Sequence, residues 1–260
     1  MHAAILPLSV ALLSWFFATG AILWLDRRPP ATWPGSLVGA TAVAGAAFGV
    51  FLISMESSTV PAAYAAFAAM ILLWGWHELS FLMGFVAGPR RQPCPADATG
   101  WRRFKLATAT LIHHEVALAA TALLLLVISW GQPNQVAAHG FLLLFVMRLS
   151  TKFNIFFGVP NFSDDMMPAH LDYLRSYFRK RRGNPLLPVS ALLSVAVTLW
   201  LATLARAAAP GSGAAVGYQL LAALSLLALL QQGAPDSRFA LLSAEIGGSY
   251  AQPGDEGGIP

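Results

Sequence analysis

Three groups of ionisable residues stand inside long apolar stretches, where a charge is costly. His77-Glu78 lies in one stretch, His113-His114-Glu115 in the next, and Arg148 with Lys152 in the one after. An ionisable group inside a membrane helix is unfavourable unless it is paired, neutralised or hydrated, so such groups usually meet one another. Counting along the helices places both acids at similar depths, and Arg148 reaches the same level. We therefore expect one buried cluster of two carboxylates, one guanidinium and up to three imidazoles.

This cluster has three chemical interpretations. It is a polar network in which Glu78 or Glu115 pairs with Arg148 and fixes the helix register. Alternatively it is a ligand site, in which a neutral histidine binds the magnesium of a chlorophyll or the cluster binds a polar headgroup. The third interpretation is a catalytic di-metal site.

The spacing of the ligand types bears on the metal interpretation. Carboxylate-bridged metal pairs in helix bundles use Glu-x-x-His, because residues three apart share a helix face. Here His77 and Glu78 are adjacent, as are His114 and Glu115, and neighbours on a helix point about 100° apart. The spacing disfavours a metal box within one helix, although several helices together still allow one. By the same geometry His113, His114 and Glu115 cannot all face one site, and we expect His114 rather than His113 beside Glu115.

The elements that carry these residues are membrane helices. The chain of 260 residues is 57% hydrophobic and only 11% charged, which is unlike a water-soluble domain of this size. A bilayer core requires about 20 apolar residues per helix. Seven stretches are long enough, which predicts an all-α, polytopic membrane helix bundle. The seven are Ala3 to Leu25, Leu37 to Met55, Ala62 to Val86, Leu106 to Trp130, Val136 to Phe157, Leu186 to Ala205 and Ala214 to Leu230.

The basic residues predict the orientation, because cytoplasmic loops retain Lys and Arg. They cluster after the first span, between the third and fourth, and between the fifth and sixth, whereas the alternate loops hold Arg206 alone. We expect a periplasmic N-terminus and a cytoplasmic C-terminus. The net charge of +4 reflects this asymmetry and does not indicate nucleic-acid binding. The lone Cys94 excludes an intramolecular disulfide and a cysteine-rich metal site.

Two further segments have distinctive patterns. The second span carries Gly35 and Gly39, then Gly45 and Gly49, and these GxxxG spacings predict a central packing helix. The long fifth-to-sixth connection has apolar residues at helical spacing over residues 163–182, which predicts an amphipathic helix on the cytoplasmic surface. It ends in a basic run that suits anionic lipid or an acidic partner, namely Arg179, Lys180, Arg181 and Arg182. The membrane domain thus covers residues 1–232, and residues 233–260 are expected to be a mostly disordered cytoplasmic tail.

Three stretches together resemble a known family. They are Trp76-His77-Glu78, His113-His114-Glu115 and, most specifically, Lys152 to Asn161 followed by His170 to Phe178. The chain resembles, over roughly residues 10 to 205, the photosynthetic complex assembly protein family PuhE of purple and related phototrophic bacteria. The residues that match its motifs are His77, Glu78, His113, His114, Glu115, Lys152, Asn154, Asn161, His170 and Tyr173.

The resemblance implies a bacterial inner-membrane protein needed for assembly of the reaction centre and core antenna, with bacteriochlorophyll supply as one route. It implies photosynthetic subunits and membrane lipids as partners and transfers no catalytic residue. We expect a non-enzymatic assembly factor whose bound group is unknown, bacteriochlorophyll being favoured over a di-metal centre. Asn154 is expected in the buried network, and Asn161, His170 and Tyr173 are expected at the partner or lipid surface. The alternative is a membrane-embedded metal enzyme that uses the His/Glu cluster on a tetrapyrrole or isoprenoid.

Overall fold

The computed structural model describes residues 2–159, 168–179 and 184–233, and this part of the chain is built from helices, as predicted. The elements in chain order are α1 (His2–Asp26), η1 (Pro30–Thr32), α2 (Trp33–Ser54), α3 (Val60–Leu82), α4 (Gly100–Ala109), α5 (Ile112–Ile128), α6 (Val136–Phe157), η2 (Ala169–Tyr177), α7 (Leu186–Ala207) and α8 (Gly213–Gly233). The last residues of the predicted C-terminal tail, 234–260, lie outside the described residues.

The long helices match the predicted spans. Within the described residues, six helices are long and apolar enough to cross a membrane, and the pair α4 and α5 makes a seventh if it is counted as one broken span. The predicted fourth span from Leu106 to Trp130 was wrong in its first part, because the chain bends by 69° between α4 and α5. The third span is also shorter than predicted, since α3 ends at Leu82 and not at Val86.

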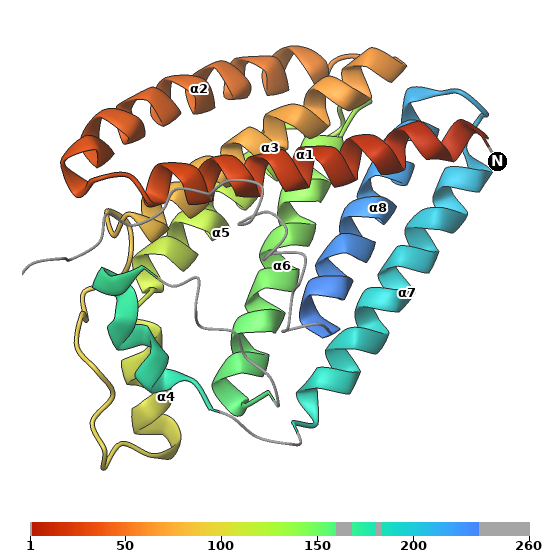
Figure 1. Ribbon diagram of the computed structural model, residues 1–260. Coiled ribbons are helices and arrows are strands. Elements are labelled where there is room, and N and C mark those ends of the chain that lie inside the picture. Colours follow the sequence, from red (N-terminus) through yellow and green to blue (C-terminus); the bar gives the residue numbers. More distant parts are fainter. Residues whose placement is uncertain (1, 160–167, 180–183, 234–260) are drawn as a thin grey trace, which may run out of the picture.

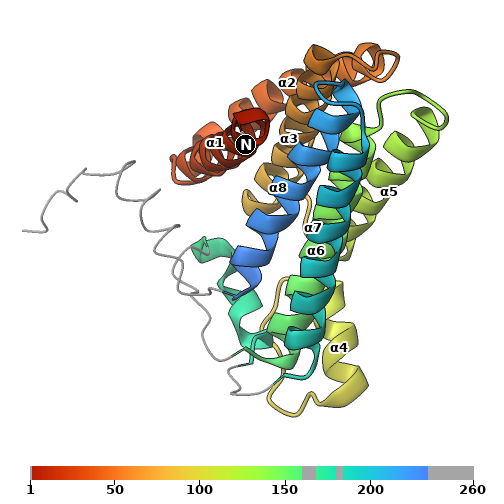
Figure 2. The same cartoon turned by 90° about the vertical axis from the view of Figure 1, so that its right-hand side faces the viewer.

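The helix α3 lies at the centre of the bundle (Figures 1 and 2). It contacts α1, α2, α5, α6 and α8, and its fully buried side chains include Phe67 and Met70. In Figure 1, α1 crosses in front of α3 and α8, and α2 covers the outer side of α3, while α6, α8 and α7 lie side by side. Phe51, Phe141, Leu118 and Leu220 bring α2, α6, α5 and α8 into the same apolar core.

The expectation that α2 is a central packing helix was wrong. It buries only Ala47, Phe51 and Ser54, and it packs mainly on α3. A side chain added at any of its four GxxxG glycines would meet nothing within 4 Å. These small residues therefore lie on the outer face of the bundle, which the spacing alone does not reveal.

The loops separate into two ends of the bundle. We call one of them the basic end. There the ring centroids of Trp33 and His170 are 5.0 Å apart, and Arg90 donates a hydrogen bond to the Tyr177 hydroxyl at 2.7 Å. At the opposite end the amide of Asn134 donates to the carbonyls of Ser54 and Ala62, at 2.9 and 3.0 Å. The three connections that carry the predicted cytoplasmic charge, after α1, α3 and α6, thus meet at one end of the bundle.

For the connection between α6 and α7 the sequence predicts an amphipathic helix over 163–182. Its described middle, η2, is a 3-10 helix, and residues 163–167 and 180–182 lie outside the described residues. The buried side chains of η2 are Leu171, Leu174 and Tyr177, which are three residues apart. That interval matches three residues per turn in a 3-10 helix and places all three on one face, where Leu171 and Leu174 pack against Phe81 and Ala87.

Candidate functional site: two ion pairs at the α3, α5 and α6 contact

The first ion pair joins the two neighbouring helices α3 and α6. Arg148 donates through Nη1 to Glu78 Oε2 at 2.5 Å, and the two side chains are only 20% and 14% exposed. Glu78 stands four residues before the end of α3, which places it about 6 Å from that end at 1.5 Å per residue. The cluster therefore lies closer to the basic end than the predicted span implied.

The second ion pair depends on how α5 begins. The loop after α3 fits into the bend between α4 and α5, where Ala87 accepts a hydrogen bond from the backbone N–H of His114 at 3.1 Å. Arg90 N donates to the carbonyl of Ala109, also at 3.1 Å. Gly88 makes this approach possible, because a Cβ there would lie 2.2 Å from the Ala109 oxygen. The loop thus supplies backbone partners to the broken helix, as non-helical backbone inside a membrane protein requires.

This bend places Glu115 in the first turn of α5. A carboxylate is favourable there, because the N-terminal end of a helix carries a partial positive charge. Lys152 of α6 donates to Glu115 Oε1. Of the two acids that the sequence offered as partners for Arg148, the structure pairs Glu78 with it, and Glu115 has its own base in Lys152. Arg148 and Lys152 are one turn apart on α6, so they reach α3 and α5 separately.

An aromatic ring links the two pairs. The ring centroid of Phe81 lies 5.7 Å from Arg148 Cζ and 5.5 Å from Lys152 Nζ. His114 lies against the same ring, with the centroids 4.6 Å apart. These distances are within the range of cation–π contacts and of aromatic packing. The side chain of Phe81 therefore belongs to the cluster, although its apolar character gave no such indication in the sequence.

The three histidines have different surroundings. His77 Nε2 forms a hydrogen bond with the Thr121 hydroxyl, and these two atoms lie 2.9 Å apart. The ring centroids of His77 and His114 are 6.4 Å apart. His114 is completely buried, and neither ring nitrogen meets a hydrogen-bond partner among the described residues. His113 is exposed. The structure thus places His114, and not His113, beside the two ion pairs.

The charges of the cluster balance, since two carboxylates face two cations. Each carboxylate is engaged by a base from α6. In the part of the chain that the structure describes, no three His, Cys, Asp or Glu side chains gather in a way that could hold a metal ion. The geometry found here is that of a polar network, with room for a ligand on one side of it.

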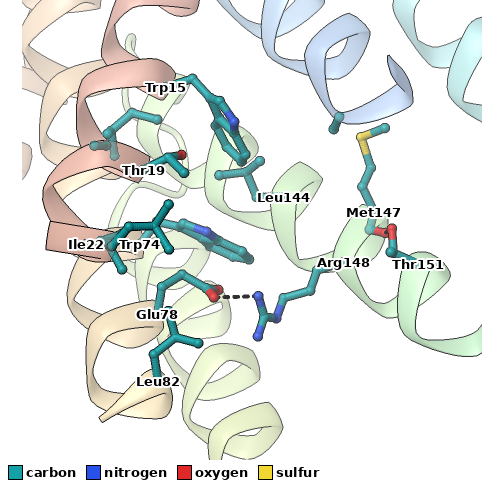
Figure 3. Close-up of a pocket in the computed structure, with 15 residues that line it drawn as sticks. Trp15, Thr19, Ile22, Trp74, Glu78, Leu82, Leu144, Met147, Arg148 and Thr151 are labelled. Atoms are coloured by element: carbon teal, nitrogen blue, oxygen red, sulfur yellow. Dashed lines mark hydrogen bonds and ion pairs between the residues drawn. The ribbon is translucent and has the colours of Figure 1, made fainter. Parts of the chain in front are cut away.

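That room is a cavity of about 360 Å³ between α1, α3, α6 and α8. Figure 3 shows the Arg148–Glu78 pair in its wall, with the indole rings of Trp15 and Trp74 projecting into it. Ile22 and Leu144 contribute apolar wall from α1 and α6. The sequence predicted the ion pair's location, but it offered no indication that α1 completes a cavity beside it.

Asn154 belongs to a different network. Its amide donates to Ser190 Oγ at 2.9 Å, and its Oδ1 accepts from Asn184 Nδ2 at 2.9 Å. The Oδ1 of Asn184 also accepts the N–H of Leu186, the first residue of α7. This joint connects the end of α6 to the start of α7 and lies apart from the ion pairs.

The predicted partner surface is described only in part. His170 is exposed and packs on Trp33, and Tyr173 is half-buried. Burial raises the pKa of the Tyr173 phenol above its ordinary value. The side chain of Arg179 is exposed, whereas Asn161, Lys180, Arg181 and Arg182 lie outside the described residues.

Arg103 was interpreted from the sequence only as part of the cytoplasmic charge. It is in fact 5% exposed, and its guanidinium donates to the carbonyl of Tyr177 and, at 3.3 Å, to that of Phe156. Its Cζ lies 4.2 Å from the Phe156 ring centroid. Arg103 therefore ties α4 to the end of α6 and to η2. The sequence held one indication that one of these arginines is buried. Arg102 and Arg103 are neighbours and cannot face the same side of a helix.

Taken together, the apolar helices and the charge-balanced interior define a multi-pass α-helical membrane protein. Residues 1–233 match the family described as protein of unknown function DUF3623, and the chain belongs to this family. It is 38% identical over 222 residues to a Rhodobacter capsulatus protein named "Uncharacterized 30.4 kDa protein in puhA 5'region", covering 84% of this chain and 80% of that protein. No solved structure matches the chain.

Proposed function

We propose that this protein is a non-enzymatic assembly factor for the photosynthetic reaction centre and its core antenna in the bacterial inner membrane. The observation that carries the proposal is the relative from Rhodobacter capsulatus, whose name places it in the puhA region, a photosynthesis locus. The motifs around His77-Glu78 and Lys152 to Phe178, which resemble the assembly family PuhE, support the same role.

The geometry is compatible with this proposal. Each carboxylate of the cluster is engaged by a cation through one oxygen, Glu78 by Arg148 and Glu115 by Lys152. The ion pairs hold α3, α5 and α6 in register near the basic end. Such a framework positions the loops of that end, which is where we propose that photosynthetic subunits dock.

The first experiment is deletion of the gene in a phototrophic host. We expect membranes of the deletion strain to lose reaction centre and core antenna absorbance in the near infrared, and the wild-type gene to restore it. Unchanged absorbance would contradict the proposal. Stoichiometric iron or zinc in protein purified in mild detergent would contradict the non-enzymatic part and favour the metal enzyme.

A second experiment addresses the docking surface. Replacement of Arg179, Lys180, Arg181 and Arg182 by Gln should leave the protein inserted, because each basic residue contributes only about 1 kcal/mol at a membrane surface. Co-purification of photosynthetic subunits, or binding to anionic vesicles at low salt, should fall. Arg206→Gln, at the opposite end of the bundle, is the matched control. If both kinds of binding are unchanged, the basic run serves only to orient the chain.

A further inference from the structure

The cavity beside the Arg148–Glu78 pair has the composition of a ligand site. Most of its lining is apolar, and its polar part is concentrated in that pair and in the hydroxyls of Thr19 and Thr151. Small-molecule sites in proteins are commonly apolar pockets with a few convergent polar groups. The volume of about 360 Å³ is at the low end of the usual range of about 300–1,000 Å³.

The ion pair leaves hydrogen-bonding capacity unused. A guanidinium has five N–H donors, and among the described residues only Nη1 of Arg148 is engaged, by Glu78. The Arg148 side chain remains 20% exposed in the cavity wall. Since Glu78 already balances the charge of Arg148, an uncharged acceptor such as a carbonyl oxygen suits the free N–H groups better than an anion, which would compete with Glu78.

The lining of the cavity also includes two indole rings. Trp15 of α1 and Trp74 of α3 both project into the space (Figure 3). Indole rings pack favourably on other flat conjugated rings, through offset stacking or edge contacts. A small cavity with two indoles suits one ring, or two fused rings, and is small for a large macrocycle.

The cavity is accessible from the side of α1. Its lining residues on this helix, including Thr19 and Ile22, are half-buried, and the neighbouring face of α1 exposes Leu13 and Phe17. Because α1 is apolar enough to cross a membrane, a molecule that reaches the cavity beside it comes from the lipid phase.

From these observations we propose that the cavity binds an uncharged, lipid-soluble molecule with a small conjugated ring that bears a carbonyl oxygen and with an apolar tail, the chemistry of a quinone. The carbonyl accepts a hydrogen bond from Arg148, the ring packs between Trp15 and Trp74, and the tail leaves along α1. This inference is independent of the proposed assembly role, since each can fail without the other.

The test uses the full chain in mild detergent, with decylubiquinone as the probe and quenching of tryptophan fluorescence as the measurement. We expect saturable quenching. Ala18→Phe fills the cavity and should weaken binding at least about tenfold. Ala21→Phe is the matched control, because Ala21 is exposed on the same helix and does not line the cavity. It should bind like the wild type.

Two further measurements keep the proposal testable if Ala18→Phe does not fold. Thr19→Leu is a milder filling of the same wall, and the double variant Glu78→Met with Arg148→Met removes both charges together. Both should lose saturable quenching. Decylbenzene, which has the ring and the tail without the carbonyl, should not compete with the quinone. Equal binding to Ala18→Phe and Ala21→Phe, full competition by decylbenzene, or displacement of the probe by phosphatidylglycerol vesicles would each overturn the proposal.

Discussion

Lys152 of α6 and Glu115 in the first turn of α5 form an ion pair one helical turn from the pair between Arg148 and Glu78. Two bases on one face of α6 thus reach two different helices, and each neutralises one acid. In this arrangement each acid has its own base. Its energetic consequence can be measured by removing the charges singly and in pairs.

Glu115→Gln and Lys152→Met should each lower the thermal stability of the detergent-solubilised protein, since a buried charge without its partner costs about 3–5 kcal/mol. The double variant should recover much of the loss. The control is a second double variant, Glu115→Gln combined with Arg148→Met. Its two effects should be closer to additive, because these residues have different partners. If the second double variant recovers more than the first, the pairing described for α5 and α6 is incorrect.

Arg103→Gln should destabilise the protein much more than the same change at its neighbour Arg102. Arg103 is buried and donates to two carbonyls, and hydrogen bonds to a charged group contribute about 1.5–3 kcal/mol each. Arg102 is exposed and pairs with the equally exposed Asp97, where solvent screens the attraction. Unfolding temperature and protein abundance in the membrane both report the difference, and equal effects would argue against the tie between α4 and α6.

Gly88→Ala should disturb the start of α5. Its Cβ would overlap the carbonyl of Ala109, and overpacking of this kind costs about 1–3 kcal/mol or more. Gly45→Ala on α2 is the control, since nothing lies within 4 Å of the added atom. We expect a lower unfolding temperature for Gly88→Ala and an equal or slightly higher one for Gly45→Ala, because alanine favours a helix more than glycine does. A tolerated Gly88→Ala would mean that the loop does not need to enter the bend.

Cys94 should be cytoplasmic, because it lies in the α3–α4 loop at the basic end. An impermeant thiol reagent should therefore label it only after spheroplasts are lysed. Glu56→Cys in a Cys94→Ala background places the thiol at the opposite end, where intact spheroplasts should be labelled. Labelling of Cys94 before lysis would reverse the predicted orientation.

The long spans were predictable because they depend on composition alone. The break between α4 and α5 was not predictable, since the stretch from Leu106 to Trp130 holds neither proline nor glycine near Thr110. The bend arises where the distant loop around Ala87 and Gly88 supplies backbone hydrogen-bond partners. A tertiary contact of this kind has no local pattern in the sequence.

The members of the cluster were predictable for a related reason, since charges inside spans are rare and must meet partners. Their pairing was not. Arg148 and Lys152 lie on one face of α6, so spacing alone cannot decide which of them faces Glu115. The contributions of Phe81, Thr121 and Trp15 escaped prediction because apolar and hydroxyl residues are common throughout membrane helices.

The bend between α4 and α5 also affects the surrounding lipid. With 17 residues, α5 is roughly 25 Å long, about 5 Å less than the hydrocarbon thickness of a typical bilayer. Its outer face exposes Val116, Leu123 and Val127, so acyl chains contact it directly. Hydrophobic mismatch of this size is relieved when the adjacent bilayer thins or when another short helix takes the place of lipid. A membrane that α5 crosses alone would therefore be thinner beside it, which would favour the approach of a protein whose own span is short.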